Sequence, residues 1–167
     1  MPSSIVQRIV LLVPISILAL GACASEEPSG GSSSVPSAAG PTSSAPMSNA
    51  CPADGCAIKI VDTARKGDEI AVTWKANFTP DISMNHIHVY WDTYSADQVS
   101  SDAEARGVQQ GKWVPTDAYP TYVTKGAVSV DTRRDSTTIC VTAGDGDHVV
   151  IDSSIVDCRE VSDLLEP

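Results

Sequence analysis

Hydrophobic and polar residues alternate along several short stretches in the last two thirds of the chain. Between residues 86 and 92, Ile87, Val89 and Trp91 alternate with polar or aromatic neighbours. The same period of two, with many β-branched residues, recurs at 58–60, 70–75, 128–131, 138–142 and 149–151. Alternation of this kind, bounded by Gly, Pro and Asp turns, is typical of half-buried β-strands. The pattern therefore predicts an all-β domain over residues 51–167.

About seven short strands in a domain of this length favour an immunoglobulin-like antiparallel β-sandwich. In such a sandwich the strand at 86–92 corresponds to strand C and the strand at 138–142 to strand F. A strand that begins at His148 would then be G, and C, F and G would be neighbours in one sheet. Between F and G, the run Asp145-Gly146-Asp147 predicts a tight hairpin turn rather than a calcium loop, because the other carboxylates of such a loop are missing.

Residues 94–111 interrupt the strand pattern, because they contain no alternation. We expect an irregular excursion there with about one helical turn. Ser101 and Glu104 have the spacing of a capping box, and Gly107 could end the turn that follows. Long loops of this kind are often functional, although a variable insertion without a role is an equal alternative.

The first 22 residues have the organisation of a secretory signal peptide. Arg8 is the only charge before an apolar run from Ile9 to Leu20. This run of 12 residues is shorter than the roughly 20 that a membrane-spanning helix needs. An uncleaved membrane helix and an ordinary secreted protein are the alternatives.

The sequence Leu20-Gly21-Ala22-Cys23 resembles the lipobox of bacterial lipoproteins, and the composition resembles that of lipoproteins from high-GC Gram-positive bacteria. The resemblance implies that Cys23 is acylated after removal of residues 1–22. The acyl chains would hold the protein on the extracytoplasmic face of the cell membrane.

Residues 23–50 are almost entirely Ser, Gly, Pro and Ala, with Glu26 and Glu27 as their only charges. Such a segment cannot bury enough apolar surface to offset its ordering entropy, so we expect a disordered, flexible linker. The chain as a whole has a formal net charge of −10. An acidic surface repels phosphate backbones, which argues against nucleic acid as a partner.

Apart from Cys23, the chain has four cysteines: Cys51, Cys56, Cys140 and Cys158. An even number in an exported domain predicts two disulfides, for which three connectivities are possible. We favour a local Cys51–Cys56 bridge, with Cys140 and Cys158 paired between late strands, over the crossed alternatives. No Cys-x-x-Cys pair occurs, so a zinc site built from these cysteines is not expected.

The three histidines of the chain are its candidate metal ligands. Residues two apart on a strand point to the same face, so His86 and His88 are neighbours on the face opposite Ile87. If His148 begins strand G, it lies at the same end of the sheet, about 9.6 Å from strand C, and the three imidazoles can meet. Met84 offers a nearby thioether.

Imidazole with a thioether suits copper, and imidazole with carboxylate suits zinc. A His-x-His pair on a strand also resembles half of the copper sites found on extracytoplasmic β-sandwiches. The alternative is that His86 and His88 lie on a solvent-exposed face without any ligand. In that case His148 simply caps the hairpin turn after Asp147.

Trp113, Pro115, Tyr119, Pro120 and Tyr122 form a cluster of aromatic residues and prolines. Such a cluster could bind a ligand, but core packing or the cover of an edge strand is the favoured interpretation.

Two functional hypotheses follow. The first is a lipid-anchored binding or interaction module of the cell envelope, without a cofactor, that recognises an envelope protein or a small ligand. Its surface would be the loops Asp81–Asn85, Tyr94–Gly111 and Gly144–Asp147. The second is a copper- or zinc-handling lipoprotein that uses the three histidines and Met84. An enzyme is not expected, because the chain has no nucleophile elbow, P-loop, Ser-x-x-Lys or His-Glu-x-x-His motif.

Overall fold

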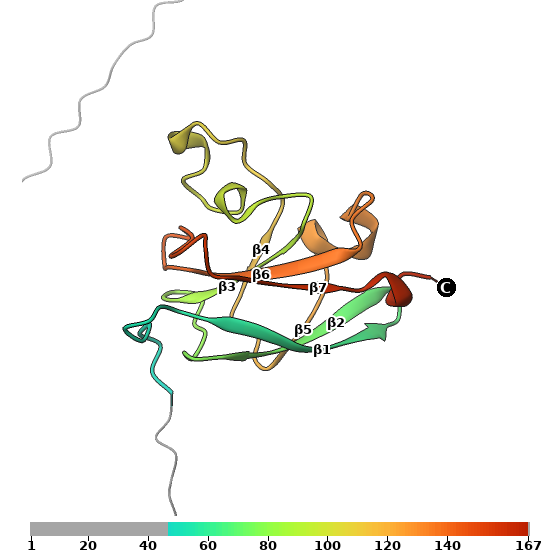
Figure 1. Cartoon of the computed structure of the whole chain (residues 1–167), viewed down its shortest axis with the longest axis horizontal. Coiled ribbons are helices and arrows are strands. Elements are labelled where there is room, and N and C mark those ends of the chain that lie inside the picture. The colour runs from blue at the N-terminus through green and yellow to red at the C-terminus, as the bar shows by residue number, and fades with distance from the viewer. Residues whose placement is uncertain (1–46, 167) are drawn as a thin grey trace, which may run out of the picture. The chain divides into compact units, whose positions relative to one another are not determined.

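The computed structural model describes residues 47–166, which form two antiparallel sheets packed against each other (Figure 1). The first sheet has the strand order β1-β2-β5 and the second the order β4-β3-β6-β7. The strands are β1 (Ile58–Lys66), β2 (Glu69–Ala76), β3 (His86–Trp91), β4 (Val114–Thr116), β5 (Thr121–Val123), β6 (Thr138–Gly144) and β7 (Val156–Glu160). This architecture confirms the predicted all-β sandwich of about seven strands.

The predicted signal peptide, the lipidation site Cys23 and most of the predicted linker lie outside the described residues. Within residues 47–166, no helix has the length and apolar character needed to cross a membrane. The first described residues already contact the sandwich: the Asn49 side-chain amide donates to the carbonyls of Thr79 and Asn85.

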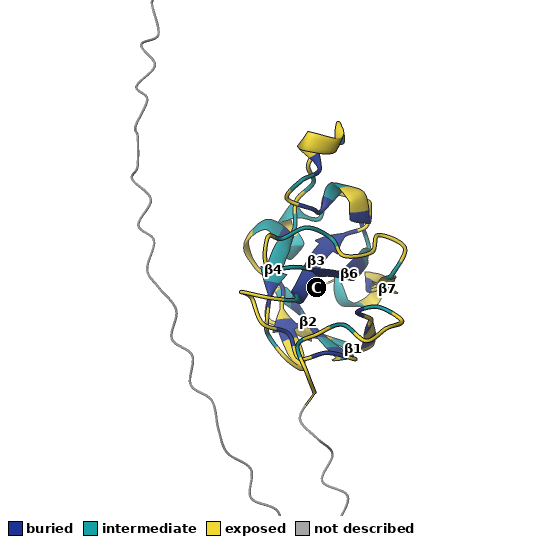
Figure 2. Cartoon of the chain, turned by 90° about the vertical axis from the view of Figure 1, so that its left-hand side faces the viewer, coloured by how far each residue is buried: buried dark blue, intermediate teal, exposed yellow. Residues whose placement is uncertain are grey.

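The hydrophobic core lies between the two sheets and appears as the dark interior of Figure 2. It is built from alternate residues, as the period of two predicts. Trp91, for example, is buried in the core and its indole N–H donates to the Val128 carbonyl at 3.1 Å. The strands supply these buried side chains: Ile58, Ile60, Ile70, Val72, Trp74, Ile87, Val89, Trp91, Tyr122, Ile139 and Val141.

The strand β3 is buried on both faces, since all six of its residues are buried. It pairs with β4 on one side and β6 on the other. The pairing with β6 sets His86 opposite Gly144 and His88 opposite Thr142. A second, smaller cluster covers the outer face of β3 and contains Tyr90, Val99 and Cys140.

Both predicted disulfides are present. Cys51 and Cys56 close the local turn, and Cys140 on β6 is bonded to Cys158 on β7. The second bridge joins directly paired residues of neighbouring strands. The connectivity favoured from the sequence is therefore confirmed.

The strand predicted at 128–131 is wrong: two short 3₁₀ turns, Gly126–Val128 and Val130–Thr132, occupy this region. The cause is Glu69, whose partly buried carboxylate accepts hydrogen bonds from the hydroxyl of Ser129 and the backbone N–H of Val130. A backbone donor bonded to a carboxylate cannot join a ladder.

The strand predicted at 149–151 is also wrong, since only an isolated bridge between Val150 and Gly144 exists there. The actual neighbour of β6 is β7, which begins later, at Val156. The predicted order of three neighbouring strands is kept, but β7 is charged and mostly exposed, so its alternation was too weak to detect. The strands β4 and β5 were missed because each has only three residues.

The excursion between β3 and β4 contains two 3₁₀ turns, Ala96–Gln98 and Glu104–Arg106, and Gly107 ends the second in a left-handed conformation. The expected irregular excursion is confirmed. The capping box was assigned to the wrong residues, because Ser95 and Gln98 form it. In Figure 1 this segment rises above the second sheet.

Candidate metal centre

The three histidines converge at one end of the sandwich. The Nε2 atoms of His86 and His88 are 3.1 Å apart, and Nδ1 of His148 lies 2.8 Å from Nε2 of His86. All three ligand atoms lie within 4.8 Å of one another. His86 and His88 are fully buried and His148 is partly exposed. A solvent-exposed face for His86 and His88, the alternative weighed from the sequence, is therefore wrong.

Backbone carbonyls hold the outward nitrogens of the two buried rings. Nδ1 of His86 lies 3.1 Å from the Met84 carbonyl, and Nδ1 of His88 lies 2.7 Å from the Val99 carbonyl. A carbonyl can only accept a hydrogen bond, so each Nδ1 carries the proton of its neutral ring. Both Nε2 atoms therefore present lone pairs, and these point at each other.

His148 reaches the centre from a turn and not from a strand. Its φ of 60° lies in the left-handed region, which few residues other than glycine adopt. The Oδ1 atom of Asp145 accepts the backbone N–H groups of Asp147 and Val149, both at 2.9 Å, and so fixes the turn. Outliers of this kind cluster at functional sites, where surrounding bonds hold them.

The excursion fixes the same turn from outside. The hydroxyl of Ser101 donates to the Asp147 carbonyl at 2.7 Å, and the Ser101 N–H donates to the His148 carbonyl at 2.9 Å. The Ser100 hydroxyl accepts the N–H of Val150 at 3.0 Å. The excursion thus holds the backbone on both sides of His148, in addition to supplying the carbonyl of Val99.

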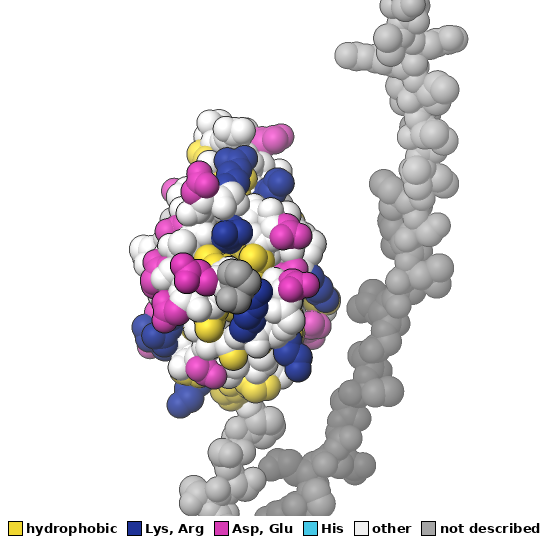
Figure 3. Space-filling model, turned by 90° about the vertical axis from the view of Figure 1, so that its right-hand side faces the viewer, with side chains coloured by type: hydrophobic (Ala, Val, Ile, Leu, Met, Phe, Trp, Pro, Cys, Tyr) yellow, Lys and Arg dark blue, Asp and Glu magenta, His cyan; other side chains and the backbone are white. Residues whose placement is uncertain are grey.

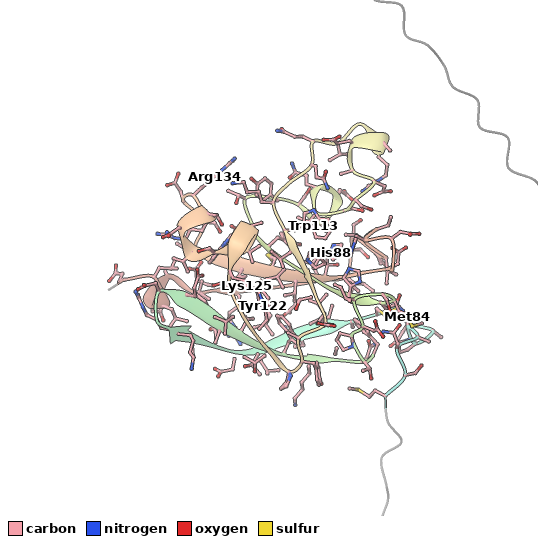
Figure 4. The ribbon with its side chains drawn as sticks, turned by 180° about the vertical axis from the view of Figure 1, so that it is seen from behind. Met84, His88, Trp113, Tyr122, Lys125 and Arg134 are labelled. Carbon is pink, nitrogen blue, oxygen red and sulfur yellow. A yellow bond between two sulfur atoms is a disulfide. The ribbon has the colours of Figure 1, made fainter. Side chains whose placement is uncertain are left out.

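Gly144 and Trp113 complete the walls of the centre. A Cβ atom on Gly144 would overlap the His88 ring, meeting Cε1 at 2.7 Å, so only glycine leaves room for the imidazole. The indole of Trp113 stacks on the His88 ring, with centroids 4.1 Å apart and planes 23° apart. Figure 4 shows Trp113 beside His88 on the outer side of the sheet.

Burial favours the neutral forms of His86 and His88. Desolvation lowers the pKa of His88 from its ordinary 6.5 to about 3, against the opposing effect of the Val99 carbonyl. Desolvation also lowers the pKa of His86, and nearby His148 lowers it further. The carboxylates of Asp145 and Asp117 raise the pKa of His86 but do not cancel the effect of burial.

Met84 contributes through its backbone carbonyl, while its side chain is 53% exposed. Figure 4 places Met84 at one end of the sandwich, away from Lys125 and Arg134. The opposite face, at the C-terminal end, carries interspersed acidic and basic side chains and no visible histidine of the described residues (Figure 3).

Sequence reasoning identified the three histidines but missed Trp113, Gly144 and the Val99 carbonyl as parts of the site. Trp113 was assigned to core packing or edge cover. Its place follows from the strand register, since Pro115 pairs with His88 and Trp113 lies two residues earlier on the same face, but the strand β4 was not predicted. The other two depend on tertiary packing and have no sequence signal of their own.

Comparison of the chain with protein-family models, with curated proteins and with solved structures found no match.

Proposed function

We propose that this domain binds one transition-metal ion, copper or zinc, through Nε2 of His86, Nε2 of His88 and Nδ1 of His148. The observation that carries the proposal is the pair of buried Nε2 lone pairs held 3.1 Å apart. The rings of His86 and His88 each donate their Nδ1 proton to a backbone carbonyl. Bonding of the outer nitrogen to a carbonyl is also the usual arrangement for histidines that ligate metals.

Without a cation the hydrogen bonds of the centre are incomplete. In a metal-free neutral site, His148 can donate its Nδ1 proton to His86 at 2.8 Å. Among the described residues, the remaining contact of His88 Nε2 is with His86 Nε2, which has no proton to give. A proton on His88 is opposed by burial, which lowers its pKa to about 3. A metal ion satisfies all three nitrogens without a proton.

The distances suit a shared ion. Three nitrogens at metal bond lengths of 2.0–2.1 Å are about 3.3–3.6 Å apart. The two nitrogen pairs that include His86 are 3.1 and 2.8 Å apart and would have to open slightly. The pair of His88 and His148, which lies within 4.8 Å, would close onto the ion through a movement of the partly exposed His148 ring. Imidazole is a ligand for both copper and zinc. The turn that carries His148 is the accessible side, by which an ion would enter.

Titration calorimetry with Cu(II) and Zn(II), and with Cu(I) under anaerobic conditions, on the purified protein tests the proposal. We expect one ion per chain, with binding reduced at least about a hundredfold in His148→Ala, because one of three ligands is lost. Asp147→Ala is the matched control, since it removes a charge from the same turn and keeps the ligand. Equal binding by wild type and His148→Ala, or none by wild type, would overturn the proposal.

We further propose that the domain works at the extracytoplasmic face of the cell membrane, held by an acylated Cys23. The support is the lipobox-like sequence that ends the predicted signal peptide. Cys23→Ser in the full chain should move the protein from the membrane fraction to the soluble fraction. Retention of this variant in the membrane would argue for an uncleaved helix instead.

A second candidate function, binding of an envelope protein or small ligand, is favoured by a separate cavity of about 350 Å³. It lies between the excursion, which is one of the loops expected to bind, and the segment after His148. Arg106 lines it together with Asp97 and Asp102. If this cavity binds the partner, Arg106→Glu should reduce crosslinking to the partner in membranes and leave metal affinity unchanged. Unchanged crosslinking would argue against this second function.

A further inference from the structure

The indole of Trp113 lies next to two of the three imidazole rings. Its ring centroid is 4.1 Å from that of His88 and 5.9 Å from that of His148. An ion bound by both imidazoles therefore lies close to the indole, near the range of about 6 Å over which aromatic rings attract cations. Tryptophan gives the strongest attraction of this kind.

Trp113 is fixed in this position. The strand β4 begins at the next residue, and its pairing of Pro115 with His88 sets the height of the indole along β3. The indole also packs on the outer cluster that contains Tyr90, Val99 and Cys140. It is consequently a rigid wall of the centre, half-buried, and not a mobile surface side chain.

The ligand set offers three neutral nitrogens and no carboxylate. Among the described residues, the only group with metal-binding spacing consists of the three histidines. The nearest acidic turn residue, Asp145, has its Oδ1 bonded to two backbone N–H groups. Zn(II) prefers four ligands and would need a water molecule as the fourth. Cu(I) is stable with three nitrogen ligands and carries a single charge that is easily desolvated.

We propose that Trp113 makes this centre selective for Cu(I) over Zn(II), by covering the bound ion and excluding a fourth, water ligand. This inference rests on the proposed metal-binding function and names its ion. The indole stabilises the bare monovalent ion through its π face. The same face disfavours Zn(II), whose coordination it leaves incomplete.

Competition titrations against chromophoric chelators test the inference. Cu(I) is kept reduced with ascorbate under anaerobic conditions, because a thiol reductant would attack the two disulfides. The variants are Trp113→Leu, which keeps an apolar wall without a π face, and Trp113→Phe, which keeps a weaker one. Tyr94→Leu is the matched control, since Tyr94 packs in the same outer cluster.

We expect Trp113→Leu to weaken Cu(I) binding by about tenfold or more and to leave Zn(II) binding unchanged or tighter. Trp113→Phe should be intermediate, and Tyr94→Leu should bind both ions like wild type. An equal loss for both metals in Trp113→Leu would mean a purely structural role, and unchanged Cu(I) binding would mean no role; either result overturns the inference. Failure of wild type to bind either ion would instead overturn the proposed function itself.

Discussion

The two faces of β3 are both buried, yet they are built from opposite kinds of residue. The inner face presents Ile87, Val89 and Trp91 to the core between the sheets. Apolar side chains pack there by contact alone and do not require hydrogen-bond partners. The outer face presents His86 and His88 to a small space beneath the excursion. Buried polar groups require partners, and a lone pair without one is costly. The comparison teaches that burial stabilises the fold on one face and leaves imidazole lone pairs without a donor on the other, which is the basis of the proposed metal site.

The largest expected effect comes from the inner face. Trp91→Ala removes a fully buried indole and its hydrogen bond to the Val128 carbonyl. We expect the free energy of unfolding to fall by about 3–5 kcal/mol, as measured by urea denaturation. Metal affinity, measured at low temperature where the variant is still folded, should change little. A large loss of affinity in the folded variant would show that the two faces are not independent.

The outer face should make the metal-free protein sensitive to acid. The unfolded chain takes up protons on histidine below pH 6.5, while burial keeps the folded-state pKa of His88 at about 3 and lowers that of His86. Stability is therefore complete above pH 6.5 and is lost as pH falls through this window. Each pH unit below 6.5 costs about 1.4 kcal/mol per histidine, so we expect His88 alone to cost roughly 2–3 kcal/mol between pH 6.5 and 4.5, and His86 to add to this loss.

Urea denaturation in the presence of a chelator measures this pH dependence. The double variant His86→Gln/His88→Gln is the control, because amides do not titrate, and its stability should be nearly flat over the same window. Similar slopes in the variant and in wild type would assign the acid sensitivity to the carboxylates instead.

A bound metal ion should raise the free energy of unfolding, because it gives the buried imidazole nitrogens of the outer face a partner. At a free metal concentration one hundred times the dissociation constant, binding to the folded state alone adds about 2.7 kcal/mol to the free energy of unfolding. Thermal unfolding with and without metal measures this gain. His148→Ala should lose the gain and keep the metal-free stability, since His148 is partly exposed. An equal gain in this variant would contradict a site shared by three rings.

We expect Gly144→Ala to have a small effect on the free energy of unfolding and a large effect on metal affinity. The added methyl group overlaps the His88 ring, which is held by the Val99 carbonyl and by Trp113 and cannot move freely. We expect overpacking to cost about 1–3 kcal/mol and metal binding to be lost. Gly67→Ala is a useful comparison, since a methyl group there meets no atom within 4 Å but has the strain of a positive φ. Retained metal binding in Gly144→Ala would show that the ring position is not critical.

Much of this arrangement could be predicted from the sequence. Period-two alternation predicted the sandwich and put His86 and His88 on one face, and the exported context predicted two disulfides. The convergence of His148 was predicted from the wrong element, because a strand was expected where a left-handed turn lies. The burial of the outer face was not predictable, because it depends on how residues 94–111 fold back over β3. The alternation along a strand shows which side chains share a face, but only tertiary packing determines whether that face is exposed to solvent.

The most direct test of the central claim is long-range ¹H–¹⁵N NMR of the imidazole rings, which the presence of only three histidines makes unambiguous. In metal-free protein at neutral pH, the account predicts the Nδ1–H tautomer for His86 and His88. One equivalent of Cu(I), which is diamagnetic, should then shift Nε2 of both rings and Nδ1 of His148 together, with saturation at one ion per chain. An Nε2–H tautomer for either buried histidine, or a shift confined to His148, would contradict the account.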